Sequence, residues 1–167
     1  MMLPGDSNES CRLAKVRSVR PADELAVQLL RRGEGLRIRA RGASMLPFVW
    51  DGDVAQVTPT ASARIAIGDV VCYETPGRLL LHRVIRRDGD RFVTKGDALS
   101  STEVIDRTQL LGKVVSVERR GSITRLDSRA ARWRNRAIVH VSPLFPHLLT
   151  LALRLRRVVR GCAAWMI

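Results

Sequence analysis

Apolar and polar residues alternate along the middle of the chain in short runs. The run at 35–41, GLRIRAR, places apolar residues between arginines with the period of two that is typical of a half-buried strand. Six similar runs follow before residue 128, and turn signals such as Asp51-Gly52 separate them. These seven short strands predict a mostly β fold, in the form of a compact antiparallel β domain.

Residues 21–35, PADELAVQLLRRGEG, follow the rules for a short helix. Pro21 suits a first helical turn, and Asp23 and Glu24 place negative charge at the positive end of the helix dipole. Gly33 suits the position just after a helix end. One helix of this length is too short for a helix-turn-helix domain, which needs two packed helices.

After Asp127 the chain becomes basic and helical in character. Residues 128–141 predict one basic helix, and two prolines then interrupt the chain. Residues 146–160 place leucines and valines opposite arginines, which predicts an amphipathic helix that either lies in a membrane interface or packs on its own β domain. The patterns divide the chain into an N-terminal segment with a short helix, a β domain and a basic amphipathic tail, at 1–34, 35–127 and 128–167.

Positive charge is concentrated in the tail. The 167 residues carry a formal net charge of +13, from 29 basic and 16 acidic residues. From Arg119 onward there are eleven arginines and one acidic residue, Asp127. A segment of this kind binds phosphates or forms a solvated face, and an anionic membrane surface is the expected partner. Nucleic acid is the less favoured partner, because no DNA-reading domain precedes the strands.

The cysteines and apolar runs bear on location. Cys11, Cys72 and Cys162 are far apart and fit no metal-binding spacing, so we expect a reducing compartment, no disulfide framework, no metal and no cofactor. The polar first fifteen residues do not resemble a secretory signal. Prolines and histidines interrupt the apolar run at 137–153, which disfavours a membrane span there. We expect a cytoplasmic protein, with peripheral attachment to the inner face of a membrane as an alternative.

Ser44 is the first candidate for chemistry. It follows the strand-like run at 35–41 and lies in the sequence GASMLP, between Gly42-Ala43 and Met45. Small neighbours allow a substrate backbone to approach, but a serine nucleophile also needs a base and donors for the oxyanion. Taken alone, a serine in such a turn is more often structural.

A base and an acid follow Ser44 in chain order. His82 lies inside the apolar strand LLLHRVI, and imidazole is well suited to general-base work near neutral pH. Asp97 follows a strand in TKGDALSSTE, where a carboxylate can orient an imidazole, and Glu103 and Asp106 are alternatives. Lys95 is an alternative base.

Four segments together carry a resemblance. GASMLPFVWDGD, IGDVVCYE, LLLHRVI and TKGDA resemble, in order and spacing, the conserved boxes of type I signal peptidases and LexA-like peptidases, over roughly 35–117. The histidine in HRVI resembles the branch found in the endoplasmic reticulum, in archaea and in sporulation. The resemblance implies the β fold of that superfamily's catalytic domain, with Ser44 as nucleophile and His82 as base.

The resemblance also assigns supporting residues. Asp97 matches the Gly-Asp of its box, and Glu103 lies near a second acidic position at which aspartate is usual. Gly42 stands where many signal peptidases have a serine that helps the oxyanion hole, so Ser44 would have to supply more of that stabilisation from its amide. Ala43 and Met45 complete the expected substrate and oxyanion contacts.

The sequence therefore predicts a serine endopeptidase that cleaves polypeptides after small residues. Two alternatives remain open at this point. One is a LexA-like self-cleaving regulator, which the missing lysine base in LLLHRVI disfavours. The other is a non-catalytic binding module that uses its arginine-rich tail.

Overall fold

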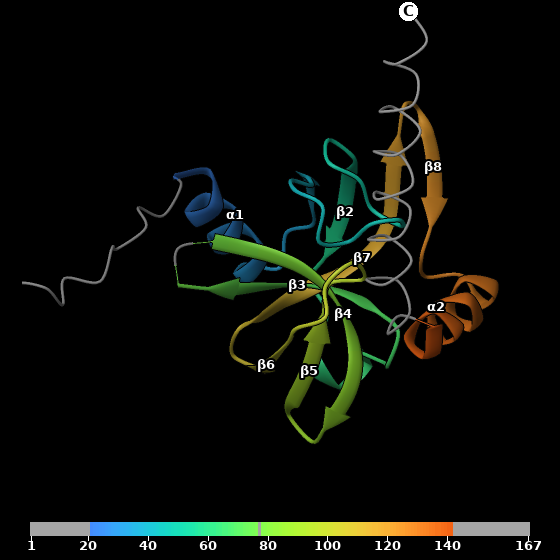
Figure 1. Cartoon of the computed structure of the whole chain (residues 1–167). Coiled ribbons are helices and arrows are strands. Elements are labelled where there is room, and N and C mark those ends of the chain that lie inside the picture. Colours follow the sequence, from blue (N-terminus) through green and yellow to red (C-terminus); the bar gives the residue numbers. More distant parts are fainter. Residues whose placement is uncertain (1–20, 77, 142–167) are drawn as a thin grey trace, which may run out of the picture.

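The computed structural model describes residues 21–76 and 78–141, and they form one curved antiparallel sheet with a helix at either end (Figure 1). The helices are α1 (Pro21–Arg31) and α2 (Arg129–Val141), and a short 3-10 turn, η1, spans Ser62–Arg64. The strands are β1 (Leu36–Arg39), β2 (Val54–Thr58), β3 (Val70–Thr75), β4 (Arg78–Asp88), β5 (Arg91–Lys95), β6 (Thr102–Asp106), β7 (Leu110–Arg119) and β8 (Ser122–Arg125). The prediction of a mostly β, antiparallel fold is confirmed.

The sheet order is β1-β2-β7-β3-β4-β5-β6, with β8 paired to β7. Two apolar clusters of buried residues lie on its two faces. The first includes Met45, Cys72 and Val114, and the second includes Tyr73, Val84 and Phe92. Neighbouring residues of β3 belong to different clusters because successive side chains of a strand point to opposite faces.

The sheet is strongly curled. Tyr73 on β3 donates a hydrogen bond to Glu103 on β6, with a distance of 2.5 Å between Oη and Oε2, although β4 and β5 lie between these strands in the sheet order. In a flat sheet, three strand spacings of about 4.8 Å would hold the two backbones about 14 Å apart. Side chains that stand perpendicular to a flat sheet would not bridge that distance. The curl therefore brings side chains from strands that are not neighbours to one place.

Both helices that lie within the described residues match their predicted positions. α1 ends at Arg31, and Gly33 follows with a φ of 89°, a conformation that glycine adopts without strain. α2 starts after Ser128, whose hydroxyl accepts a hydrogen bond from the Ala131 amide as a helix cap. Among residues 21–76 and 78–141, no helix is long and apolar enough to cross a bilayer.

One strand was missing from the sequence prediction. β6 (Thr102–Asp106) lies between the predicted strands that became β5 and β7, where the pattern predicts no strand, so the sheet has eight strands and not seven. β6 pairs only with β5 within the described chain, and Ile105 is its one buried residue, so the alternation that marks a strand is weak there. The predictions for the helix at 146–160, for Cys11 and Cys162, and for most of 137–153 lie outside the described residues.

Candidate functional site

Ser44 lies in a compact turn between β1 and β2. The amides of Phe48 and Val49 both donate to the carbonyl of Met45, and the Met45 side chain is buried in the first cluster. The Ser44 side chain is half-buried, and its hydroxyl forms no hydrogen bond with any residue the structure describes. The turn thus presents a hydroxyl without a structural hydrogen-bond partner on a well-anchored backbone.

The amides of this turn differ in their availability. The Gly42 amide donates to the Asp51 carboxylate at 2.8 Å, so it shapes the turn and is not free to bind an oxyanion. Within residues 21–76 and 78–141, the amides of Ser44 and Met45 donate to no other group. These two adjacent donors are therefore the part of the turn that could stabilise a negative oxygen. Ala43 contributes its carbonyl to the Leu46 amide and is exposed.

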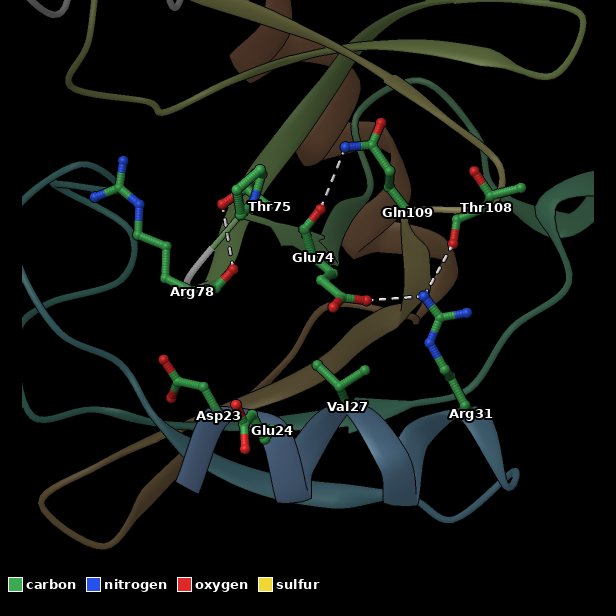
Figure 2. A pocket seen from close by; sticks show the side chains of 10 residues that line it. Asp23, Glu24, Val27, Arg31, Glu74, Thr75, Arg78, Thr108 and Gln109 are labelled. Atoms are coloured by element: carbon green, nitrogen blue, oxygen red, sulfur yellow. Dashed lines mark hydrogen bonds and ion pairs between the residues drawn. The ribbon is translucent and has the colours of Figure 1, made fainter. Parts of the chain in front are cut away.

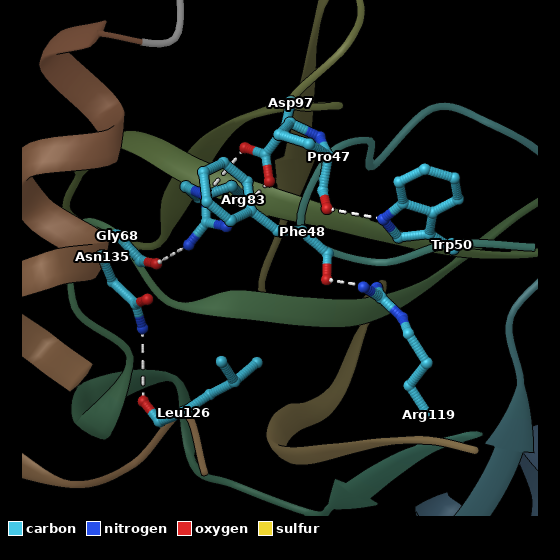
Figure 3. Close-up of polar contacts among 9 residues, drawn as sticks. All are labelled: Pro47, Phe48, Trp50, Gly68, Arg83, Asp97, Arg119, Leu126 and Asn135. Atoms are coloured by element: carbon cyan, nitrogen blue, oxygen red, sulfur yellow. Dashed lines mark hydrogen bonds and ion pairs between the residues drawn. The ribbon is translucent and has the colours of Figure 1, made fainter. Parts of the chain in front are cut away.

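A buried ion pair lies beside the turn, next to Phe48 (Figure 3). Both side-chain nitrogens Nε and Nη2 of Arg83 donate to the Asp97 carboxylate, at 2.8 and 2.7 Å, and Nη1 donates to the Gly68 carbonyl. The ring of Phe48 lies over this guanidinium, with the Arg83 Cζ 5.4 Å from the ring centroid. Asp97 is thus engaged with Arg83, and its hydrogen bonds in the described chain do not reach His82.

The loop after β5 fixes the position of Ser44. The Ala98 amide donates to the Ser44 carbonyl at 2.9 Å, and Gly96 packs so closely that an added Cβ would lie 2.7 Å from the same oxygen. Lys95, just before this loop, is paired with Arg83 on β4. The Ser44 turn therefore lies where β5 separates from β4, beside the pair His82-Arg83.

His82 points to the opposite face of β4 from Arg83, toward Tyr73. The Tyr73 hydroxyl is 2.8 Å from Nδ1 of His82 and 2.5 Å from Oε2 of Glu103. Both rings are buried, with 4% of His82 and none of Tyr73 exposed. Glu103 thus reaches His82 through Tyr73. The sequence pattern did not single out Tyr73 as a site residue.

No hydrogen bond joins the Ser44 hydroxyl to His82 among the described residues. Nε2 of His82 also has no hydrogen-bond partner there. The structure therefore brings His82 and Glu103 into one cluster. It places Ser44 near Asp97 through the Gly96–Ala98 loop. No hydrogen bond among the described residues joins Ser44 to the His82 cluster.

The environment of His82 favours the neutral imidazole. Burial lowers the pKa of His82 below its usual 6.5, and the negative charges of Glu103 and Asp97 offset part of that effect. A neutral imidazole is the form that accepts a proton. His82 is thus in the protonation state of a general base at neutral pH.

Lys95 is the second candidate base. Its cross-strand partner is Arg83, so both side chains leave the sheet on the face where Phe48 packs. Lys95 is 7% exposed, and burial lowers the pKa of its ammonium group while Asp97 partly offsets this. Lys95 lies on the same face of the sheet as Phe48 of the Ser44 turn, which favours Lys95 as the partner of that turn. The pKa of His82, by contrast, is the one suited to a base at neutral pH.

Asp106, the third acid considered, lies away from the site. It forms an ion pair with Arg91 at 3.4 Å, and both side chains are mostly exposed. No group of three or more histidine, cysteine or acidic side chains that could hold a metal ion occurs in the described part of the chain.

A groove of about 1120 Å³ has Ser44 among its lining residues. Its walls come from α1, β1, the Ser44 turn and the start of β4, and they include Leu25, Ile38, Met45, Leu79 and Leu81. Leu80 also lines it, although it faces the other side of β4 from Leu79 and Leu81. The groove therefore follows the edge of β4 and is open to side chains from both faces.

Two unpaired strand edges border this groove. β4 pairs with β3 over Arg78–Arg83, but β5 joins its other side only from Arg83 onward. β1 pairs with β2 alone among the strands described. On the side toward the groove, the backbone groups of 79–82 and of 36–39 thus pair with no strand that the structure describes. Such strand edges accept an added strand.

A second cavity, of about 470 Å³, lies between α1 and the turn from β3 to β4 (Figure 2). Arg31 of α1 forms an ion pair with Glu74 of β3 at 2.8 Å across it. Asp23 and Arg78 line both cavities, so the two cavities adjoin at α1 and the start of β4.

No protein-family model matches this sequence, and no curated protein matches it either.

Proposed function

We propose that this chain is a serine endopeptidase of the signal peptidase type, in which Ser44 attacks a peptide bond and His82 acts as the general base. The groove with its two unpaired edges is the observation that carries the proposal, because Ser44, whose hydroxyl would attack, is among the residues that line it. An extended peptide would pair its main chain with β1 or β4, as β-strand addition requires. Its side chains would meet a mainly apolar lining.

The reaction would proceed through an acyl-enzyme. The Ser44 oxygen bonds to the substrate carbonyl carbon while its proton moves to Nε2 of His82, and the amides of Ser44 and Met45 stabilise the oxyanion. The imidazolium then gives its proton to the departing amine. Water attacks the ester by the same route and releases the acid. Closure of the gap between Ser44 and His82 would accompany substrate binding, since catalytic hydrogen bonds are often long before substrate is bound.

The test compares the wild-type protein with Ser44→Ala and His82→Ala on peptides that contain small residues, with products identified by mass spectrometry. We expect cleavage after small residues by the wild type and its loss, by about 10³-fold or more, in both variants. Ser122→Ala, an exposed serine on β8, is the matched control and should cleave normally. Circular dichroism establishes that each variant is folded. Cleavage that survives Ser44→Ala would overturn the proposal.

The unbonded Ser44 and His82 favour a second candidate function, a module that binds extended peptides without cleaving them. The same peptides, labelled with a fluorophore and titrated with the wild type, measure that binding. Binding by a wild-type protein that cleaves none of the peptides would support the binding module over the peptidase.

A further inference from the structure

Tyr73 occupies the centre of a polar cluster inside an otherwise apolar core. Its hydroxyl is 2.8 Å from Nδ1 of His82, 2.5 Å from Glu103 and 3.4 Å from the hydroxyl of Thr94. These partners come from three strands, β4, β6 and β5. A buried hydroxyl with this many partners is fixed in direction by what each of them can donate or accept.

The direction of the hydrogen bonds follows from a proton count. A carboxylate only accepts, so the single phenolic proton of Tyr73 is donated to Glu103. The Tyr73 oxygen can then only accept from His82, which requires the ring proton to be on Nδ1. Nε2 of the neutral ring is left with its lone pair, and it has no partner among the residues described.

We propose that Tyr73 is a positioning residue, which links Glu103 to His82 and holds the imidazole in the tautomer whose Nε2 can accept a proton. This inference rests on the proposed function and deepens it, because it explains how an acid that does not touch His82 can still prepare it. Glu103 acts by orienting the Tyr73 hydroxyl. Asp97 has a separate task in the ion pair with Arg83.

The proton of Tyr73 stays in place throughout. Burial and the hydrogen bond to Glu103 raise the pKa of Tyr73 well above its usual 10, so the phenol does not ionise when His82 becomes charged. When Nε2 takes the proton of Ser44, the imidazolium still donates from Nδ1 to Tyr73, and Tyr73 still donates to Glu103. The negative charge of Glu103 stabilises the imidazolium through this fixed chain.

The charged groups around His82 come from several elements. Glu103 on β6 and Asp97 after β5 favour its protonated form, and Arg78 on β4 opposes it. Tyr73 on β3 adds a hydrogen bond without a charge. Loss of the charge of Glu103 should therefore lower the pKa of His82. Loss of the Tyr73 hydroxyl should remove the hydrogen bond that keeps the ring proton of His82 on Nδ1.

The test uses the full chain labelled with 15N at histidine, and the His82 signals are assigned with His82→Ala. In the wild type we expect Nδ1 to carry the proton. Tyr73→Phe keeps the ring and removes the hydroxyl, so we expect the ring proton to shift toward Nε2. Glu103→Gln keeps an oxygen acceptor for Tyr73, so it should retain the tautomer and lower the pKa of His82. Glu74→Gln, the same change in an exposed ion pair on β3, is the control and should change neither.

Hydrolysis gives the second measurement. Tyr73→Phe should lower kcat/KM by about 10²-fold, a contribution typical of a positioned general base, with KM little changed. A wild-type His82 protonated at Nε2, or a tautomer unchanged in folded Tyr73→Phe, would overturn the role of Tyr73 even if Ser44 is catalytic. Absence of hydrolysis by every form, with the expected tautomers, would count against the peptidase and leave the hydrogen-bond chain in place. If Tyr73→Phe does not fold, the tautomer of His82 in the wild type and in Glu103→Gln still tests the role of Tyr73.

Discussion

At the scale of single residues, two acids near His82 have different physical roles. Asp97 is 1% exposed and bound by two nitrogens of a guanidinium, whereas Glu103 is half-buried and bound by a phenol. A carboxylate that neutralises a buried cation stabilises the fold, because its loss leaves an unpaired buried charge. A carboxylate at the end of a hydrogen-bond chain acts mainly on the group at the other end.

The two roles predict different costs in stability. Asp97→Asn should lower the free energy of unfolding by about 3–5 kcal/mol, because it leaves the Arg83 charge buried and unpaired. Glu103→Gln should cost about 1 kcal/mol, since an acceptor for Tyr73 remains. Urea unfolding followed by fluorescence measures both. Equal costs for the two changes would contradict this division.

The pH dependence of hydrolysis identifies the base. With His82 as base, kcat/KM should rise with pH to a plateau through a midpoint below 6.5, because burial lowers the pKa of His82 and the neutral form is the active one. Lys95→Met should keep this midpoint, because it leaves the imidazole unchanged. If Lys95 were the base, its lowered pKa would set the midpoint, and Lys95→Met would abolish activity. Initial rates from pH 4 to 10 separate the two cases.

At the scale of elements, the position of Ser44 depends on one loop contact. The loop after β5 approaches the Ser44 carbonyl so closely that only a glycine fits at residue 96. This glycine lets the loop approach the Ser44 turn, and the Ala98 amide then bonds to the Ser44 carbonyl, so two segments far apart in the sequence are joined.

Gly96→Ala should therefore damage both activity and stability. The new methyl would lie 2.7 Å from the Ser44 carbonyl and 2.9 Å from Leu99, so the Ser44 turn must move. We expect a loss of about 1–3 kcal/mol in unfolding free energy and of about 10²-fold in kcat/KM, the cost of a displacement near 1 Å. Gly35→Ala, which meets no atom closer than 3.4 Å, is the control and should keep near-normal activity. Equal activity losses in both variants would contradict this explanation.

At the scale of the whole molecule, stability should fall in acid in two steps. The pKa of His82 is lowered by burial in the folded state, so below its usual 6.5 the unfolded chain binds a proton that the folded chain excludes. The stability that depends on a neutral His82 is complete above 6.5 and is lost as pH falls toward the folded pKa. Asp53, whose pKa the hydrogen bond from Arg119 lowers, adds a second loss below its usual 3.8.

Urea unfolding between pH 3 and 8 checks this expectation. His82→Asn should flatten the curve between pH 6.5 and 5, where one such group contributes at most about 1.4 kcal/mol per pH unit. The steeper loss near pH 3 should remain, because Asp53 and Arg119 are unchanged. A wild-type curve that stays flat down to pH 4 would contradict the burial of a neutral His82.

The elements of this chain were largely determined by its local sequence. α1 was predictable because Pro21, the two acids and Gly33 occupy positions that suit them in any isolated helix. β1 and β2 were predictable because one face of each is more buried than the other, which leaves alternation in the sequence. β3, which is buried on both faces, and β8, which is exposed throughout, were predictable as short runs between turn signals. β6 was missed because no glycine or proline between Ala98 and Leu111 marks its ends, and Ile105 is its one buried residue.

The candidate site was predictable only in part, because a sequence pattern carries residue types but not their partners. Ser44, His82, Asp97 and Glu103 were identified from their motifs, and their roles remain predictions. The pairing of Asp97 with Arg83 and the place of Tyr73 between Glu103 and His82 depend on strand register and on the curl of the sheet. Those contacts join side chains from different strands and from the loop after β5, and only tertiary structure decides them. The sequence determined which residues form most of the strands, and packing of the curled sheet determined which side chains meet.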